Sequence, residues 1–215
     1  MQEYESVNYK GYEIKIYHDE DPMDPREWDN LGTMMCAHRE YNLGDEFVSG
    51  DEIREFIEEN TDIILLPLYL YDHGGITMST GRFSCPWDSG QVGIIYITKE
   101  KARKEYDWKY LTKERIQKIV RYLENEVETY DDYLTGNVFG YQIWKDGEEE
   151  DGSCWGFFGH DHEESNLLGY AQDEIDHLIE KEQERIKAGR KRHADYLKGI
   201  IRKRIPFIYR KPLIV

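Results

Sequence analysis

Alternation of apolar and polar residues predicts most of the strands of this chain. Between Val7 and Tyr17 the side chains alternate with a period of two, and we expect one strand there. Residues 62–71 form an almost continuous apolar run, which is typical of a buried strand. Pro67 within that run places it at a sheet edge or beside a bulge. Further strands are predicted at 28–39, 76–80, 92–98, 136–145 and 153–158.

Helices are predicted where apolar residues recur every three or four positions after a capping residue. Ser49 and Glu52 match a capping box, and Thr98 and Thr112 match the N-caps of two further helices. From about Glu163 onward the pattern is helical again. The sequence therefore predicts an α+β fold: a mostly antiparallel sheet, several packed helices and a protruding, charged C-terminal helix.

Charge divides the chain into two parts. The net charge is −16, yet residues 181–215 hold 12 Lys and Arg against 3 Asp and Glu, leaving −25 for the remainder. We therefore predict an acidic α+β domain over 1–180 and a basic helical arm over 181–215. The helix beyond residue 180 is charged nearly all round, which is typical of a helix that docks on a partner, bridges solvent or frays. The alternative is a solvated acidic surface that this helix neutralises within the molecule.

The remaining composition favours a cytoplasmic protein. No apolar run approaches 18 residues, and no apolar leader follows Met1. Cys36, Cys85 and Cys154 are an odd number at wide spacing, which argues against a secreted disulfide framework. We expect no contact with a membrane.

Polar residues concentrate in the loop after the buried strand, and this loop is the candidate small-molecule site. Cys85 or Ser89 as nucleophile with His73 as base is one interpretation, which requires the groups to meet in space. We prefer the alternative that Cys85 and Trp87 are buried packing residues and that Asp88 and Ser89 bond the turn backbone. If a ligand binds here, the residues expected to contact it are Asp72, His73, Cys85, Trp87, Asp88, Ser89 and Gln91.

Metal and phosphate motifs are weak. In each of the pairs Cys36/His38 and His160/His162 the residues are two positions apart, which places both side chains on the same face of a strand. No C-x2-C or H-x3-H pair occurs, however. No phosphate-binding glycine loop is present. We therefore predict no metal, no cofactor and no catalytic residues.

Four strings in the chain resemble a family of uncharacterised proteins encoded by bacteriophages and other mobile elements. They are DNLG at 29–32 followed by Cys36 and His38, CPWDSGQVG at 85–93, YLTGNVFGY at 133–141 and SCWGFFG at 153–159. The resemblance covers about residues 12–159. It implies an accessory role for a phage or mobile element, and it carries over no catalytic residue.

Together, charge and resemblance predict a binding protein rather than an enzyme. We expect it to bind and inhibit a host protein, such as a nucleic-acid-binding complex of CRISPR or restriction defence, because an acidic surface can occupy a basic channel. A small enzyme, or a protein that binds a ligand or sequesters a nucleotide, using the loop from Asp72 to Gln91, is one alternative. Nucleic-acid binding through the arm is another, although we find no helix-turn-helix and no basic–aromatic strand. The expected partner contacts are the acidic Glu148, Glu149, Glu150 and Asp151 and the basic Arg190, Lys191, Arg192, Arg202, Lys203 and Arg204.

Overall fold

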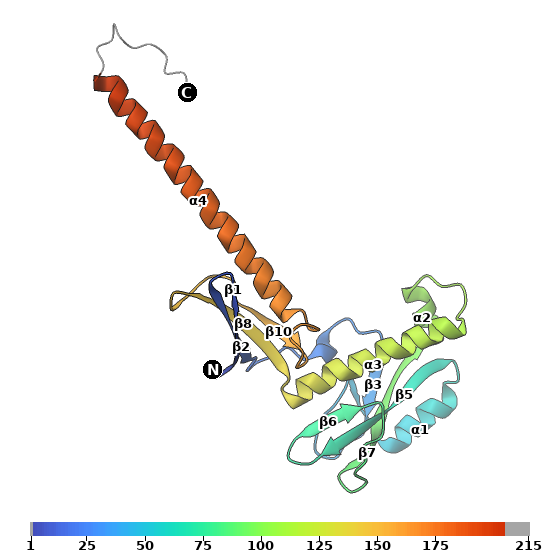
Figure 1. The fold of residues 1–215 in the computed structure, drawn as a ribbon. Helices are drawn as coiled ribbons and strands as arrows, with labels where there is room; N and C mark the ends of the chain where they lie inside the picture. Colours follow the sequence, from blue (N-terminus) through green and yellow to red (C-terminus); the bar gives the residue numbers. More distant parts are fainter. Residues whose placement is uncertain (1, 205–215) are drawn as a thin grey trace.

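The chain folds into two five-stranded sheets: one packs against α1 (Gly50–Glu59) and α3 (Lys113–Thr135), and the other packs against the first part of a long helix that projects from it (Figure 1). The structure is a computed structural model, and it describes residues 2–204. The predicted α+β class is confirmed. The sequence indicated one sheet, whereas the strands divide into two.

Sheet A is antiparallel throughout and has the order β1-β2-β8-β10, with β9 also paired to β8. The single strand predicted between Val7 and Tyr17 is wrong, because Lys10 and Gly11 both have positive φ and turn the chain back. The result is a two-residue hairpin. The strands are β1 (Glu3–Tyr9), β2 (Tyr12–His18), β8 (Val138–Lys145), β9 (Glu148–Glu149) and β10 (Cys154–Phe158).

The acidic segment after β8 also turns more tightly than its length suggests. Lys145 pairs with Glu148, and the two residues between them, Asp146 and Gly147, have φ values of 52° and 86°. Positive φ at both central positions is the geometry that Asp-Gly supplies in two-residue hairpins. The predicted strands at 136–145 and 153–158 leave room for a longer turn over 146–152, but the structure has a two-residue turn there instead. We call residues 146–151 the acidic hairpin tip.

Sheet B has the order β4-β3-β7-β5-β6, and only its β3–β4 pair is parallel. Strand β6 pairs with β5 only from Tyr69 to Asp72, so Pro67 lies where β5 has no neighbour on that side, next to a register shift at Leu68/Tyr69. Both features predicted for Pro67 are thus present. The strands are β3 (Thr33–Cys36), β4 (Glu46–Phe47), β5 (Ile63–Asp72), β6 (Ile76–Ser79) and β7 (Ser89–Thr98).

Helices cover both faces of sheet B. One face packs against α3 through Ile119, Leu123 and Val127, and the other packs against α1 through Ile53. The predicted N-caps are confirmed: Ser49 forms a full capping box, and the Thr98 and Thr112 side chains each accept a backbone N–H. The helical segments are η1 (Pro25–Glu27), α1 (Gly50–Glu59), α2 (Lys99–Glu105), α3 (Lys113–Thr135) and α4 (Leu167–Arg204).

Helix α4 is packed at one end and free at the other. Leu167, Ala171 and Ile175 are fully buried against sheet A, whereas the residues beyond Ile179 leave the sheet (Figure 1). At 1.5 Å per residue, the 38 residues of α4 span about 57 Å. The helix is continuous across residue 180, so the predicted boundary there marks a change of charge and not a break in the helix. We call residues 181–204 the arm; residues 205–215 lie outside the described part.

None of the described helices combines the length and apolar composition needed to cross a bilayer.

Candidate functional site

The ends of β5 and β7 bring the predicted loop residues together. Asp72 is the last residue of β5 and Ser89 the first of β7, and the Asp72 N–H donates to the Asp88 carbonyl over 2.8 Å. The antiparallel pairing of the two strands therefore places both ends of the 16-residue segment 73–88, which contains β6, at one point of sheet B. Asp72, Asp88 and Ser89 become neighbours through backbone geometry alone.

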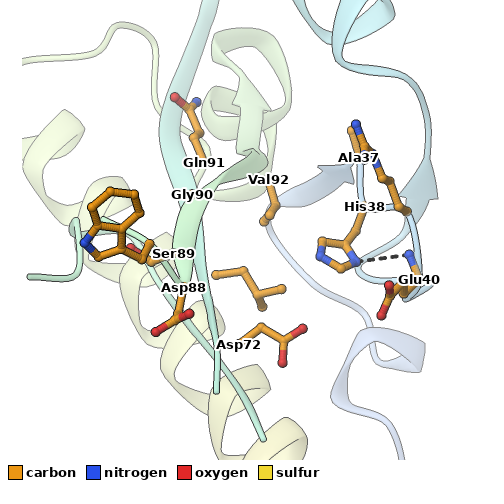
Figure 2. Close-up of a pocket in the computed structure, with 12 residues that line it drawn as sticks. Ala37, His38, Glu40, Asp72, Asp88, Ser89, Gly90, Gln91 and Val92 are labelled. Carbon is orange, nitrogen blue, oxygen red and sulfur yellow. Dashed lines mark hydrogen bonds between the residues drawn. The ribbon is translucent and has the colours of Figure 1, made fainter. Parts of the chain in front are cut away.

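Beside these strand ends lies a cleft of about 480 Å³ (Figure 2). Five of the seven residues predicted for ligand contact line it: Asp72, Trp87, Asp88, Ser89 and Gln91. The predicted residues His73 and Cys85 are not among its lining residues.

The opposite wall of the cleft is the connection between β3 and β4. It contributes His38, Arg39 and Glu40, and Figure 2 shows His38 and Glu40 across from Asp72 and Asp88. His38 Nδ1 accepts the N–H groups of Glu40 and Tyr41 at 3.3 and 3.2 Å. That pattern leaves only Nε2 of His38 able to meet a ligand. The sequence did not predict this wall, although the Cys36/His38 pair had drawn attention to it as a metal site.

Trp87 is not a packing residue. It is 91% exposed and belongs to the residues that line the cleft, so the preferred interpretation of this tryptophan as a buried packing residue is wrong. Exposed tryptophans on loops are uncommon in a folded surface and are enriched where a partner or ligand binds. Trp87 is therefore the strongest single indication that the cleft has an occupant.

The polar groups around Trp87 do not form a catalytic triad. The Cys85 thiol lies 3.4 Å from an Asp88 carboxylate oxygen, and the Ser89 hydroxyl donates to the Cys85 carbonyl. His73 is largely exposed, with Nδ1 3.5 Å from the same Asp88 oxygen. In the described chain neither Cys85 nor Ser89 has a histidine as its hydrogen-bond partner, as a triad of the Ser-His-Asp or Cys-His type would need. The arrangement suits binding.

The two residue pairs considered for metals also have other roles. Cys36 is buried in the core, where desolvation raises the pKa of its thiol to about 12. His162 is buried, and desolvation lowers its pKa. Among residues 2–204, no group of three or more His, Cys, Asp or Glu side chains is placed to hold a metal ion.

A buried charge cluster beside α3 is structural. The Arg26 guanidinium bonds Asp45 at 2.6 Å and Glu126 at 3.1 Å, and Glu126 also accepts the N–H groups of Leu31 and Gly32. Each charge is thus paired and hydrogen-bonded, as burial requires. The cluster ties η1 and the start of β3 to α3.

The second candidate surface is the arm with the acidic hairpin tip. Glu148, Glu149 and Asp151 are exposed, while Glu150 is half-buried and its N–H bonds the Ile143 carbonyl. The tip lies near the base of the arm. A hydrogen bond from Arg185 lowers the pKa of Glu182, and the charge of Lys145 beside the tip contributes to the same shift.

The six basic residues predicted for partner contact are all exposed and have no carboxylate partner in the described chain. The only ion pair within the arm joins Arg185 to Glu182, at 2.7 Å. The arm points away from both sheets (Figure 1). Among residues 2–204 the arm thus forms no ion pair with the acidic domain, and the alternative that the helix neutralises the acidic surface within the molecule stays a prediction. The residues concerned are Arg190, Lys191, Arg192, Arg202, Lys203 and Arg204.

Comparison with known proteins gave no match: no protein-family model, no curated protein and no solved structure matches this chain. The function is therefore argued from the fold, the cleft and the arm.

Proposed function

We propose that this protein is a non-catalytic binding protein that engages and inhibits a host macromolecule through the arm. The observation that carries the proposal is the arm's isolation: residues 181–204 form a continuous helix, and apart from Arg185, which pairs with Glu182, its basic side chains have no carboxylate partner among residues 2–204. An isolated, charged helix gains little stability from its own chain. The positive charge of the arm can contribute to binding when a partner presents a negatively charged surface to it.

Two further features support an inhibitor of nucleic-acid-directed defence. The body of the protein is strongly acidic, and the acidic hairpin tip adds Glu148, Glu149 and Asp151 beside the base of the arm. An acidic surface of this kind mimics a phosphate backbone and fits a basic nucleic-acid channel. The resemblance to phage-encoded proteins supports our proposal that the host partner belongs to a defence complex of the CRISPR or restriction kind.

Phage plating efficiency tests this function. The full chain, expressed in bacteria that carry such a defence system, is expected to raise the plating efficiency of a targeted phage. A chain ending at Glu180 keeps the residues of α4 that pack on sheet A, and we expect it to fold and to lose this effect. Equal protection by the shortened chain, or no protection by the full chain against any defence tested, contradicts the proposal.

A second candidate function, binding of a small molecule in the cleft, is favoured by the exposure of Trp87 beside Asp72 and Asp88. An aromatic face and two carboxylates suit a ring that carries hydrogen-bond donors, such as a nucleobase. Thermal-shift titration with a panel of nucleosides and nucleotides tests it. A stabilisation that disappears in Trp87→Ala and persists in Trp28→Ala supports the site, and the absence of any shift removes it.

A further inference from the structure

Basic residues of this acidic chain gather in two segments, of which the arm is only one. Residues 99–122 hold nine Lys and Arg against four Asp and Glu. With residues 181–215 they contain 21 of the 28 basic residues, and the rest of the chain carries a net charge of −30. The segment comprises α2, the connection 106–112 and the first turns of α3. It lies at the end of α3 away from the arm (Figure 1), and we call it the α2–α3 surface.

Aromatic rings are built into this basic segment. Tyr106 and Trp108 stack with their centroids 4.5 Å apart and their planes 18° apart. The Lys118 ammonium lies 4.9 Å from the Tyr106 ring and 5.6 Å from the Tyr122 ring, and the Arg115 guanidinium lies 4.9 Å from Trp108. These cation–π contacts hold charge and ring side by side on one surface.

Part of this aromatic surface faces solvent. Tyr110 is 63% exposed and Tyr122 is 42% exposed, at either side of Arg115 and Lys118. Large rings that remain exposed among charged residues offer faces for stacking.

Most cations of the α2–α3 surface lack acidic partners in the described chain. Elsewhere in this chain, basic residues such as Lys10, Arg26 and Arg54 contact a carboxylate. In the α2–α3 surface, eight of the nine basic side chains have no carboxylate partner among residues 2–204; the exception is Lys99, which contacts Asp62. The eight are Lys101, Arg103, Lys104, Lys109, Lys113, Arg115, Lys118 and Arg121. Unpaired cations in a chain with a large excess of acid indicate an anionic partner from outside.

We propose that the α2–α3 surface binds single-stranded nucleic acid. Lys104, Lys109 and Lys118 contact phosphates, and bases stack on Tyr110 and Tyr122. A groove or platform that combines backbone-tracking cations with exposed rings is the general device for binding a single strand without sequence preference. A duplex hides the faces of its bases, and its extended charge meets the acidic remainder of the protein, so we expect weaker binding of duplex.

Fluorescence anisotropy with a labelled oligothymidylate of about 15 nucleotides tests the proposal. Binding is expected to weaken as salt rises. The double variant Lys109→Gln/Lys118→Gln should reduce the slope of log K against log salt by about 1.4, since each single-strand phosphate contact contributes about 0.7. Tyr110→Ala/Tyr122→Ala should weaken binding about tenfold or more with an unchanged slope, because stacking carries no counterion release. Tyr110→Ala alone, at the more exposed position, serves if the double variant is unstable.

Matched controls separate this surface from the rest of the molecule. Arg54→Gln on α1 and Tyr170→Ala on α4 remove an exposed charge and an exposed ring elsewhere, and both should bind like the unmodified chain. A full-length variant in which the six basic arm residues named above become Gln should retain oligothymidylate binding. That result holds whether or not the arm engages a host macromolecule, so the two proposals fail separately.

Four outcomes overturn the proposal. The first is that oligothymidylate does not bind at low salt, and the second is that the arm variant loses binding while the Lys109/Lys118 and Tyr110/Tyr122 variants keep it. The third is that a duplex binds as tightly as the single strand. The fourth is that polyglutamate displaces bound oligothymidylate at the same concentration as unlabelled oligothymidylate does. The last of these would assign the surface to an acidic protein segment.

Discussion

The two halves of α4 show what the same helix does with and without a sheet beneath it. Ile175 and Ile186 are eleven residues apart, about three turns, and therefore lie on the same face. Ile175 is fully buried against sheet A, whereas Ile186 is 43% exposed in the arm. The first half thus contributes to the stability of the fold, and the second half is available for a partner. Each of the following predictions tests that division.

The largest expected effect is on stability, from matched isoleucine truncations. Ile175→Ala should lower the free energy of unfolding by about 2–5 kcal/mol, because it removes a buried side chain and leaves a cavity. Ile186→Ala removes the same atoms from an exposed site and should change it by less than about 0.5 kcal/mol. Urea denaturation of the two variants measures both. Similar losses at the two positions would mean that the arm packs on the body in solution.

A smaller effect concerns pH and the anchored end of α4. His162 precedes the helix, and its carbonyl accepts the Leu168 N–H. Its ring is 7% exposed between Tyr4 and Phe139, and neither ring nitrogen has a hydrogen-bond partner in the described chain.

Burial lowers the pKa of His162, against the opposing charges of Glu5 and Asp161. The unfolded chain, with an ordinary histidine pKa of about 6.5, therefore takes up the proton more readily than the folded protein. The contribution of His162 to stability is present above that pH and declines as the pH falls below it. His162→Phe should flatten the dependence of unfolding free energy on pH between about 7 and 5. The exposed His193→Phe in the arm is the control, and an equal flattening there would refute the assignment.

The smallest effect is on the arm itself. A Cβ at Gly189 or Gly199 would meet no atom within 4 Å. Gly189→Ala and Gly199→Ala should therefore each favour the helix by about 1 kcal/mol locally. We expect slower amide hydrogen exchange in the arm and an unchanged unfolding transition of the body. A raised transition would show that the arm and the body unfold as one unit.

Local patterns in the sequence predict much of the fold. The Ser49, Thr98 and Thr112 caps each satisfy a helix N-terminus with a nearby side chain, so a few neighbouring residues are enough to predict them. The first hairpin was missed because Lys10-Gly11 interrupts a run that still alternates on both sides. The division into two sheets was missed because strand partners are chosen by long-range pairing: β2 joins β8, more than 100 residues away.

The candidate sites, like the fold, were predicted where their residues are close in sequence and missed where long-range pairing brings them together. Five cleft residues lie within one stretch of sequence and were predicted, whereas His38 to Glu40 reach the cleft only through the pairing of β3 with β7. The exposure of Trp87 could not be predicted, because a loop tryptophan has the same sequence pattern whether it is buried or not. The α2–α3 surface was missed because its rings and cations alternate across two helices and a connection instead of along one strand.

The most direct test of the arm as the partner-binding surface is the affinity for the host macromolecule that copurifies with the full chain. Replacing Arg190, Lys191, Arg192, Arg202, Lys203 and Arg204 with Glu reverses the charge of the arm, and all six side chains are exposed. We predict that the dissociation constant rises by at least about tenfold, because charge pairs at the interface with the partner are lost. We also predict that the unfolding transition of the body stays unchanged, because the six side chains are exposed. An unchanged dissociation constant would contradict the assignment of the arm as the binding surface.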